Sequence, residues 1–160
     1  MRMRFTGILA IPLVVLAALG GAFIVGMRTK NPSVLGVVRS LNRGFWNPRA
    51  METAGTPGAY ASIVRHAGRT SGTEYETPVG AVASDDGFLI ALPYGAHADW
   101  LQNVLVGGRA VIVDEGETHE VDRPEVVEID EVASYFSAGE QRAQRVFGVD
   151  QALRVRHIAK

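Results

Sequence analysis

The residues best suited to bind an anion lie in one loop, Gly68-Arg69-Thr70-Ser71-Gly72. Residues 60–64 before it are rich in β-formers and residues 74–83 after it have the pattern of a returning strand, so the loop is predicted to join two strands. Glycines at a strand end let backbone N–H groups point outward and approach an anion closely. The arginine adds a planar, permanently charged fork that suits phosphate or carboxylate. The same residues are also typical of an ordinary hairpin loop with a solvated arginine, and both interpretations stay open.

A second group of candidate residues lies between Pro93 and Trp100. His97 can donate a proton near neutral pH, and Tyr94 can donate a hydrogen bond to a carbonyl oxygen, so both are catalytic candidates. Each has a structural alternative, an exposed loop histidine and a tyrosine at the edge of the core. Asp99 is predicted to cap the helix that contains Trp100, and Trp100 is predicted to pack in the core.

The composition excludes several classes of site. The chain has 160 residues and no cysteine, which excludes disulfides and thiol chemistry. Its four histidines show no metal-ligand spacing, so no metal site is predicted. The net charge of −1 argues against a broad nucleic-acid surface. A hydrophobic content of 47% with 21% charged residues is typical of one folded domain, which we expect over residues 31–160.

Residues 7–26 contain no charge and no strongly polar side chain. As a helix they would be about 30 Å long, the thickness of the hydrocarbon core of a bilayer. We therefore predict a single-pass transmembrane anchor, with a cleaved signal peptide and a buried core helix as the alternatives. Arg2 and Arg4 precede the segment, and a larger number of positive charges follows it. This excess favours a protein of the plasma membrane whose C-terminal domain is cytoplasmic.

The rest of the chain combines short helices with short strands. Asn31-Pro32 is predicted to start a helix that runs to about Asn42, and Phe45-Trp46-Asn47-Pro48 to end it. Further helices are expected at residues 99–106, 130–137 and 139–147. Strands are expected at residues 60–64, 74–83, 88–92, 110–113, 118–121, 125–129 and 151–157. This order is not the βαβ alternation of a Rossmann fold, and it predicts an α+β domain built on a small barrel of six or so antiparallel strands with peripheral helices.

Several short motifs follow one another in a characteristic order over residues 31–130. They are Asn47-Pro48, Ser62-Ile63-Val64-Arg65-His66-Ala67-Gly68-Arg69-Thr70-Ser71-Gly72, Tyr75-x-Thr77-Pro78-Val79, Asp85-Asp86-Gly87, and Ala98-Asp99-Trp100-Leu101-Gln102-Asn103-Val104 with Gly107. Together they resemble the deazaflavin-dependent nitroreductase family, the split β-barrel oxidoreductases of actinobacteria that use reduced coenzyme F420. The ordered series is much more specific than any single motif.

The resemblance implies a split β-barrel of the FMN-binding type that holds its cofactor in a groove. Arg69 would bind the phosphate tail, the next loop residues would add contacts, and the following strand would line the ring. The residues that would contact the cofactor are Arg69, Thr70, Ser71, Gly72, Pro78, Val79, Pro93, Tyr94 and Trp100. Hydride would pass from reduced F420 to a lipophilic acceptor such as a quinone, a nitroaromatic, or an unsaturated acyl compound or enone. FMN is the weaker candidate cofactor.

The sequence departs from the family where the tail would bind. Members that bind F420 commonly carry Lys or Arg directly after the loop arginine, where this chain has Thr70, and the chain continues Thr73-Glu74-Tyr75-Glu76. Two carboxylates near the loop would repel an anionic tail. The series Tyr94-Gly95-x-x-x-Asp99-Trp100 resembles a membrane-associated branch of the family with hydrophobic substrates.

Two hypotheses follow from these observations. The first is a membrane-anchored oxidoreductase that uses reduced F420. The second is a non-catalytic split barrel that binds a fatty acyl or isoprenoid ligand at the membrane. The depleted basic content around Arg69 separates the two, and a homodimer is left open for either.

Overall fold

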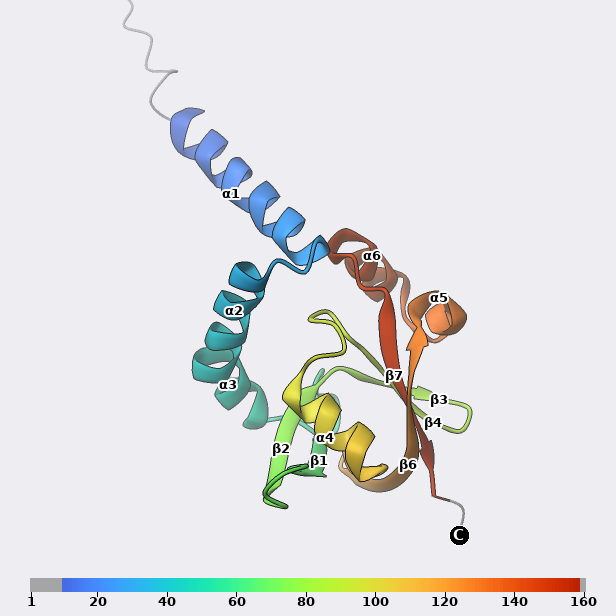
Figure 1. Ribbon diagram of the computed structural model, residues 1–160. Coiled ribbons are helices and arrows are strands. Elements are labelled where there is room, and N and C mark those ends of the chain that lie inside the picture. The colour runs from blue at the N-terminus through green and yellow to red at the C-terminus, as the bar shows by residue number, and fades with distance from the viewer. Residues whose placement is uncertain (1–9, 159–160) are drawn as a thin grey trace, which may run out of the picture.

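The computed structural model describes residues 10–158, which form a curled antiparallel sheet flanked by helices (Figure 1). Its strands are β1 (Ser62–Ala67), β2 (Glu74–Val79), β3 (Ala81–Ser84), β4 (Gly87–Ala91), β5 (Arg109–Asp114), β6 (Glu117–Glu128) and β7 (Gln151–His157). The strand order is β2-β1-β5-β6-β7-β4-β3, and every neighbouring pair is antiparallel. The edge strands β2 and β3 do not pair with each other, so the curled sheet does not close and forms a half-barrel. The predicted α+β class is confirmed, with seven strands where six or so were expected.

The helices lie around this sheet (Figure 1). They are α1 (Ala10–Arg28), α2 (Pro32–Leu41), the π-helix η1 (Asn42–Trp46), α3 (Asn47–Met51), α4 (Asp99–Gly107), α5 (Ile129–Val132), the 3-10 helix η2 (Ala133–Tyr135) and α6 (Ala138–Phe147). The α1 helix projects from the rest of the molecule, and α2 to α3 descend along one side of it. The predicted N-cap is confirmed, since the Asn31 side chain accepts hydrogen bonds from the N–H groups of Ser33 and Val34.

The core lies on both faces of the sheet. On one face, α4 packs Leu101 and Val104 against apolar side chains of β1, β4, β5, β6 and β7. On the other face, Val132 and Phe136 cover Leu89 of β4. Both faces of β4 are therefore buried, which explains its unbroken apolar sequence. The packing of α4 also fixes the polar residues of that helix beside the loop after β1.

Several predicted boundaries are wrong, such as the strand expected at residues 60–64, which is β1, and the helix expected at 130–137, which is α5 followed by η2. Three further differences concern how elements are joined or divided. The helix expected to end at residues 45–48 continues through η1 into α3, because the widened π-turn directly before Pro48 accommodates a ring that a regular helix would exclude. Residues 74–83 form two strands separated by Gly80. Residues 118–121 and 125–129, expected as two strands, belong almost entirely to β6, in which a register shift between Asp122 and Glu125 takes up the break at Pro124.

The C-terminal end of α1 is attached to the domain. Arg28 Nη1 donates to the carbonyl oxygen of Arg145 at 2.5 Å, and Lys30 Nζ donates to that of Gly148 at 2.9 Å. Among the described residues, no helix is long and apolar enough to cross a membrane. The predicted anchor begins at residues 7–9, outside the described part of the chain, and its remainder lies in α1.

Gly87 begins β4 at a point where the neighbouring strand leaves no room for a side chain. A Cβ atom there would collide with the carbonyl oxygen of Val155 on β7. We expect Gly87→Ala to push the two strands apart and to lower the free energy of unfolding by about 1–3 kcal/mol. Urea unfolding of the full-length protein in mild detergent, followed by tryptophan fluorescence, measures the change.

The matched control is Gly36→Ala on α2, where nothing lies within 4 Å of the added methyl group. This variant should be neutral or stabilising by up to about 1 kcal/mol, because alanine is the better helix former. Equal losses in the two variants would contradict the steric explanation for Gly87.

Candidate functional site

A cavity of about 600 Å³ opens where the loop after β1 meets η1 and the start of α4. We call it the loop cavity. Its walls come from five elements, η1, β1, β2, α4 and the loop itself. The lining residues are Arg43, His66, Gly68, Arg69, Thr70, Ser71, Tyr75, Glu76, Thr77, Asp99, Trp100 and Asn103.

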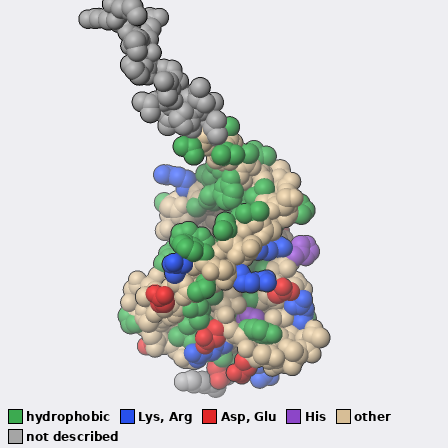
Figure 2. Space-filling view, turned by 90° about the vertical axis from the view of Figure 1, so that its left-hand side faces the viewer, with side chains coloured by type: hydrophobic (Ala, Val, Ile, Leu, Met, Phe, Trp, Pro, Cys, Tyr) green, Lys and Arg blue, Asp and Glu red, His purple; other side chains and the backbone are tan. Residues whose placement is uncertain are grey.

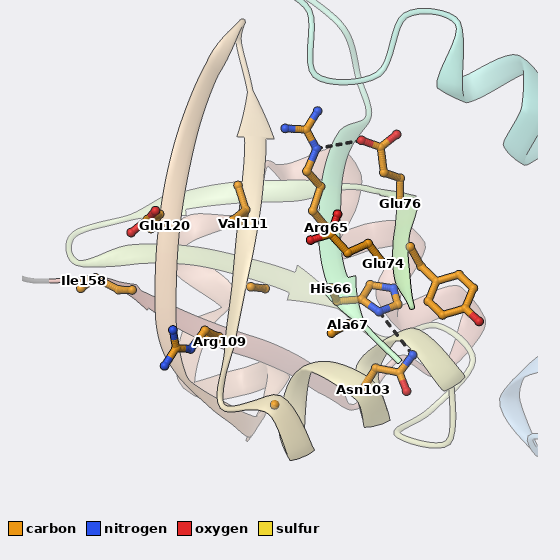
Figure 3. A pocket seen from close by; sticks show the side chains of 13 residues that line it. Arg65, His66, Ala67, Glu74, Glu76, Asn103, Arg109, Val111, Glu120 and Ile158 are labelled. Atoms are coloured by element: carbon orange, nitrogen blue, oxygen red, sulfur yellow. Dashed lines mark hydrogen bonds and ion pairs between the residues drawn. The ribbon is translucent and has the colours of Figure 1, made fainter. Parts of the chain in front are cut away.

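A larger cavity of about 830 Å³ adjoins the loop cavity and shares four lining residues with it, His66, Tyr75, Glu76 and Asn103 (Figure 3). It lies over β1, β2, β5 and β6, and contains charged side chains such as Arg65 and Arg109. None of the residues that the family motifs place against the cofactor lines this cavity. We therefore assign the candidate site to the smaller loop cavity, because residues predicted for the site line it.

The structure brings together only part of the predicted site. Arg69, Thr70, Ser71 and Trp100 line the loop cavity. Gly72, at φ 68°, closes the loop behind them in a conformation that favours glycine. Trp100 also packs against the core, as the sequence predicts.

The other predicted residues lie elsewhere. Pro78 and Val79 are farther along β2, and Val79 packs against the core. Pro93 lines a small cavity beside α6. The Tyr94 hydroxyl accepts a hydrogen bond from Asn42 Nδ2 at 2.7 Å, which fixes residues 93–98 to η1. His97 is exposed and lies outside the loop cavity.

Most backbone N–H groups of the loop already donate to an acceptor within the loop or on α4. The N–H of Gly68 donates to Thr73 O (2.7 Å), that of Arg69 to Asn103 Oδ1 (3.1 Å), that of Gly72 to Gly68 O (2.8 Å) and that of Thr73 to Ser71 Oγ (3.2 Å). Within the described residues, the N–H groups of Thr70 and Ser71 alone have no acceptor in this loop. The free amides are therefore those at the tip of the loop, between the two glycines.

The Arg69 side chain is hydrogen-bonded to residues of α4 that also line the loop cavity. Its Nη2 donates to Asp99 Oδ1 at 3.1 Å, and its Nη1 donates to Asn103 Oδ1 at 2.8 Å. The prediction that Asp99 caps α4 is wrong, because the N-cap is Ala98 and no side chain caps this helix. The Asp99 side chain is 81% exposed, so the ion pair contributes less than about 1 kcal/mol. A ligand anion can therefore compete with Asp99 for Arg69.

Arg43 is a second cation at the loop cavity, and it is not among the residues predicted for the site. It lies on η1, is exposed, and lines both the loop cavity and a shallow hollow that it shares with Arg39. None of the ion pairs between described residues involves Arg43. With Arg69 held by Asp99, Arg43 is the cation more readily available to an anionic ligand.

A chain of hydrogen bonds runs behind the cavity from the loop to β2. Asn103 Nδ2 lies 3.3 Å from His66 Nδ1, and His66 Nε2 lies 3.2 Å from Thr77 Oγ1. Figure 3 shows the His66 and Asn103 side chains turned toward each other. Both side chains are buried. Burial lowers the pKa of His66 below its ordinary value, and a backbone hydrogen bond at Ala67 opposes this in part.

Sequence reasoning did not select His66, Thr77 or Asn103 as site residues. The three residues lie on β1, β2 and α4, and no local sequence pattern predicts that their side chains are in contact. All three lie within the motifs of the family resemblance, which is the available signal.

Neither a family model nor a curated protein matches the sequence. Among solved structures, an F420-H2 dependent reductase (FDR-A) has a TM-score of 0.46 at 14% identity, covering 59% of this chain and 92% of that one. The haem storage protein HutZ from Vibrio cholerae has a TM-score of 0.46 at 14% identity, covering 71% and 90%. A protein described as a domain-swapped dimer has a TM-score of 0.46 at 16% identity, covering 75% and 97%. No activity, cofactor or assembly of this chain follows from likenesses at that level.

His66 should make the stability of the fold depend on pH. Because its pKa is lowered in the folded state, the unfolded chain takes up a proton below about pH 6.5, the ordinary histidine value, while the folded protein resists it. The free energy of unfolding should then fall on acidification, by at most about 1.4 kcal/mol per pH unit, until the lowered pKa is passed. Urea unfolding between about pH 7.5 and pH 5 tests this.

The comparison variant is His66→Gln, which removes the titrating group. Its stability should depend less steeply on pH than that of the wild type, whatever its stability at pH 7.5. Parallel curves for the two proteins would contradict the role given to burial.

Proposed function

We propose that the chain is an oxidoreductase. It binds reduced coenzyme F420 in the loop cavity and catalyses the transfer of a hydride from F420 to a lipophilic acceptor. The observation that carries the proposal is the loop cavity itself. Two motifs of the family resemblance meet there, although Arg69 and Asp99 are 30 positions apart in the sequence. A cavity of about 600 Å³ is also in the size range of small-molecule sites.

The residues at the cavity fit an anionic tail of a cofactor. The unengaged N–H groups of Thr70 and Ser71 lie beside Arg43 and Arg69. Backbone amides and arginines are the groups that bind phosphate in proteins. Gly68 keeps the loop compact, since a Cβ atom there would lie 2.9 Å from Ser71 Oγ and from the Tyr75 ring.

When bound, F420 supplies the hydride, so this chain needs no acid–base dyad of its own for that step. The chain's residues bind and orient. Trp100 and Tyr75 provide aromatic surface, and α4 closes one side of the cavity. The lipophilic acceptor, whether a quinone, a nitroaromatic or an unsaturated acyl compound, is a part of the proposal that rests on the resemblance.

The charges at the cavity predict weak binding of an anionic tail. Two arginines line it together with two carboxylates, Glu76 and Asp99. Glu76 is paired with Arg65 at 2.7 Å, and Asp99 with Arg69. This balance supports the second candidate function, a non-catalytic barrel that holds a fatty acyl or isoprenoid ligand. A homodimer stays a prediction for either function.

The direct test is a titration of the full-length protein in mild detergent with F420 and with FMN, following tryptophan fluorescence. F420 should bind more tightly than FMN. Arg43→Ala should weaken F420 binding about 3- to 10-fold, because an exposed charge-assisted contact is lost, and the loss should shrink at high salt.

Arg49→Ala is the matched control. It removes the same charge from α3, where the guanidinium lies 3.7 Å from the centroid of the Phe45 ring, outside the loop cavity. Its affinity for F420 should stay within about twofold of the wild type. Binding of a fatty acid without any binding of F420 would replace the oxidoreductase proposal with the binding-module proposal.

We further propose that the apolar segment starting at residue 7 holds the domain at the plasma membrane. In Figure 2, hydrophobic side chains gather toward the N-terminal end of the molecule, and basic side chains lie across its middle. Several large apolar side chains are exposed on α1, α2 and η1. They are Leu16, Leu19, Phe23, Val25, Val37, Leu41, Phe45 and Trp46. Burial of such surface in lipid is favourable, which supports attachment through these helices.

Cell fractionation tests the attachment. The full-length chain should sediment with membranes and resist extraction by alkaline carbonate. Because the sequence has no cysteine, Thr118→Cys at an exposed position of β6 gives a single reactive thiol. A membrane-impermeant maleimide should label it only after lysis if the domain is cytoplasmic. Recovery in the soluble fraction without detergent would refute the attachment, and labelling of intact cells would refute the orientation.

A further inference from the structure

We propose that Thr77 is a fixed hydrogen-bond donor that recognises a carbonyl oxygen on a planar ring bound in the loop cavity, and that His66 and Asn103 are positioning residues that set its direction. This inference deepens the proposed function and relies on it for the cavity that holds the ligand. It does not require the ligand to be F420.

The first step is the orientation of the Asn103 amide. Its Oδ1 faces two donors of Arg69, the backbone N–H at 3.1 Å and Nη1 at 2.8 Å. A flipped amide would place the hydrogens of Nδ2 against both of these N–H groups. The oxygen therefore faces Arg69, and Nδ2 must donate to His66 Nδ1 at 3.3 Å.

The second step is the tautomer of His66. Because Nδ1 accepts a hydrogen bond, it carries no proton, and the proton of the neutral imidazole is on Nε2. The ring is only 6% exposed, and burial disfavours its charged form. His66 therefore donates from Nε2 to Thr77 Oγ1, at a distance of 3.2 Å.

The third step concerns the hydroxyl of Thr77. Its oxygen accepts from His66, so its own hydrogen cannot point back to the imidazole. Thr77 is half-buried, lines the loop cavity, and has no other side-chain partner among the described residues. The hydroxyl hydrogen is thus available to an acceptor in the cavity.

The surroundings of Thr77 narrow the class of acceptor. Glu76 is adjacent in sequence and also lines the cavity, so a second negative charge beside Thr77 is unfavourable. The Tyr75 ring stacks on His66 with centroids 5.8 Å apart, and Trp100 lines the same cavity. Aromatic surface around one fixed donor suits a planar ring that carries a carbonyl oxygen, as quinones, flavins and deazaflavins do.

The first measurement needs no ligand. ¹⁵N NMR of the full-length protein in mild detergent at pH 8 should show His66 as a neutral ring with its proton on Nε2. Asn103→Asp keeps an acceptor for Arg69 but removes the donor to His66, so the proton of the neutral ring should move to Nδ1. A merely structural role for Asn103 predicts no such exchange. A wild-type ring protonated on Nδ1, or an unchanged tautomer in the variant, would overturn the proposal.

The second measurement uses two probes, F420 and 1,4-naphthoquinone-2-sulfonate. Thr77→Val removes the hydroxyl at nearly constant volume and should weaken binding about 3- to 10-fold, while Thr77→Ser should restore it. Asn103→Asp should weaken binding similarly at high pH, although it leaves the Thr77 hydroxyl in place. Equal affinity of the wild type and Thr77→Val, or binding of neither probe, would overturn the proposal.

The two probes keep the proposals separable. If F420 does not bind but the quinone binds with the expected dependence on Thr77, the proposed function fails and the inference on Thr77 stands. If F420 binds and Thr77→Val is neutral toward both probes, the inference fails and the proposed function stands.

Discussion

The hydrogen bonds of Asn103 are the interaction on which the candidate site depends. One buried amide joins three elements, since it accepts twice from Arg69 in the loop, donates to His66 on β1, and belongs to α4. Leaving a buried donor or acceptor unpaired costs about 1–3 kcal/mol, so the loop and the helix cannot shift independently. The apolar packing of Leu101 and Val104 fixes α4 on the sheet. The hydrogen bonds of Asn103 then fix the loop relative to α4.

This constraint decides which cation faces the cavity. Because Arg69 is turned toward α4, the loop arginine is not free in the way its sequence suggests, and Arg43 becomes the more available charge. Arg43 reaches the cavity only because the helical segment continues through the π-turn η1, which the Tyr94–Asn42 hydrogen bond holds in place. The same segment is continuous with α2 and the exposed apolar surface, so the cavity wall and the proposed membrane-facing surface are parts of one helical run.

The sequence predicts those features of this fold that depend on neighbouring residues. The Asn31 cap and the strand at residues 151–157 follow from local rules, and both are confirmed. Asp99 is a case where local rules fail. An aspartate at the start of a helix normally caps that helix, but here the Asp99 side chain pairs with Arg69 instead. The meeting of His66 with Asn103 and the approach of Arg43 to the loop depend on packing between distant segments, which leaves no trace in local spacing.

The direction of the hydrogen-bond chain also bears on the choice between the two candidate functions. A site for an acyl or isoprenoid chain needs apolar surface and at most one polar group near its mouth, and it gains little from a donor whose direction is fixed by two buried side chains. A ring that must be presented in one orientation for hydride transfer gains more, since a fixed donor discriminates between otherwise similar poses without adding charge. The balanced charges weaken the case for a strongly held anionic tail, but the ordered series from Arg69 through Asn103 and His66 to Thr77 favours an oriented ring. In the proposed function, orientation of the ring would depend on the buried pair His66 and Asn103 with the half-buried Thr77, whereas affinity for the tail would depend on the exposed Arg43 and Arg69.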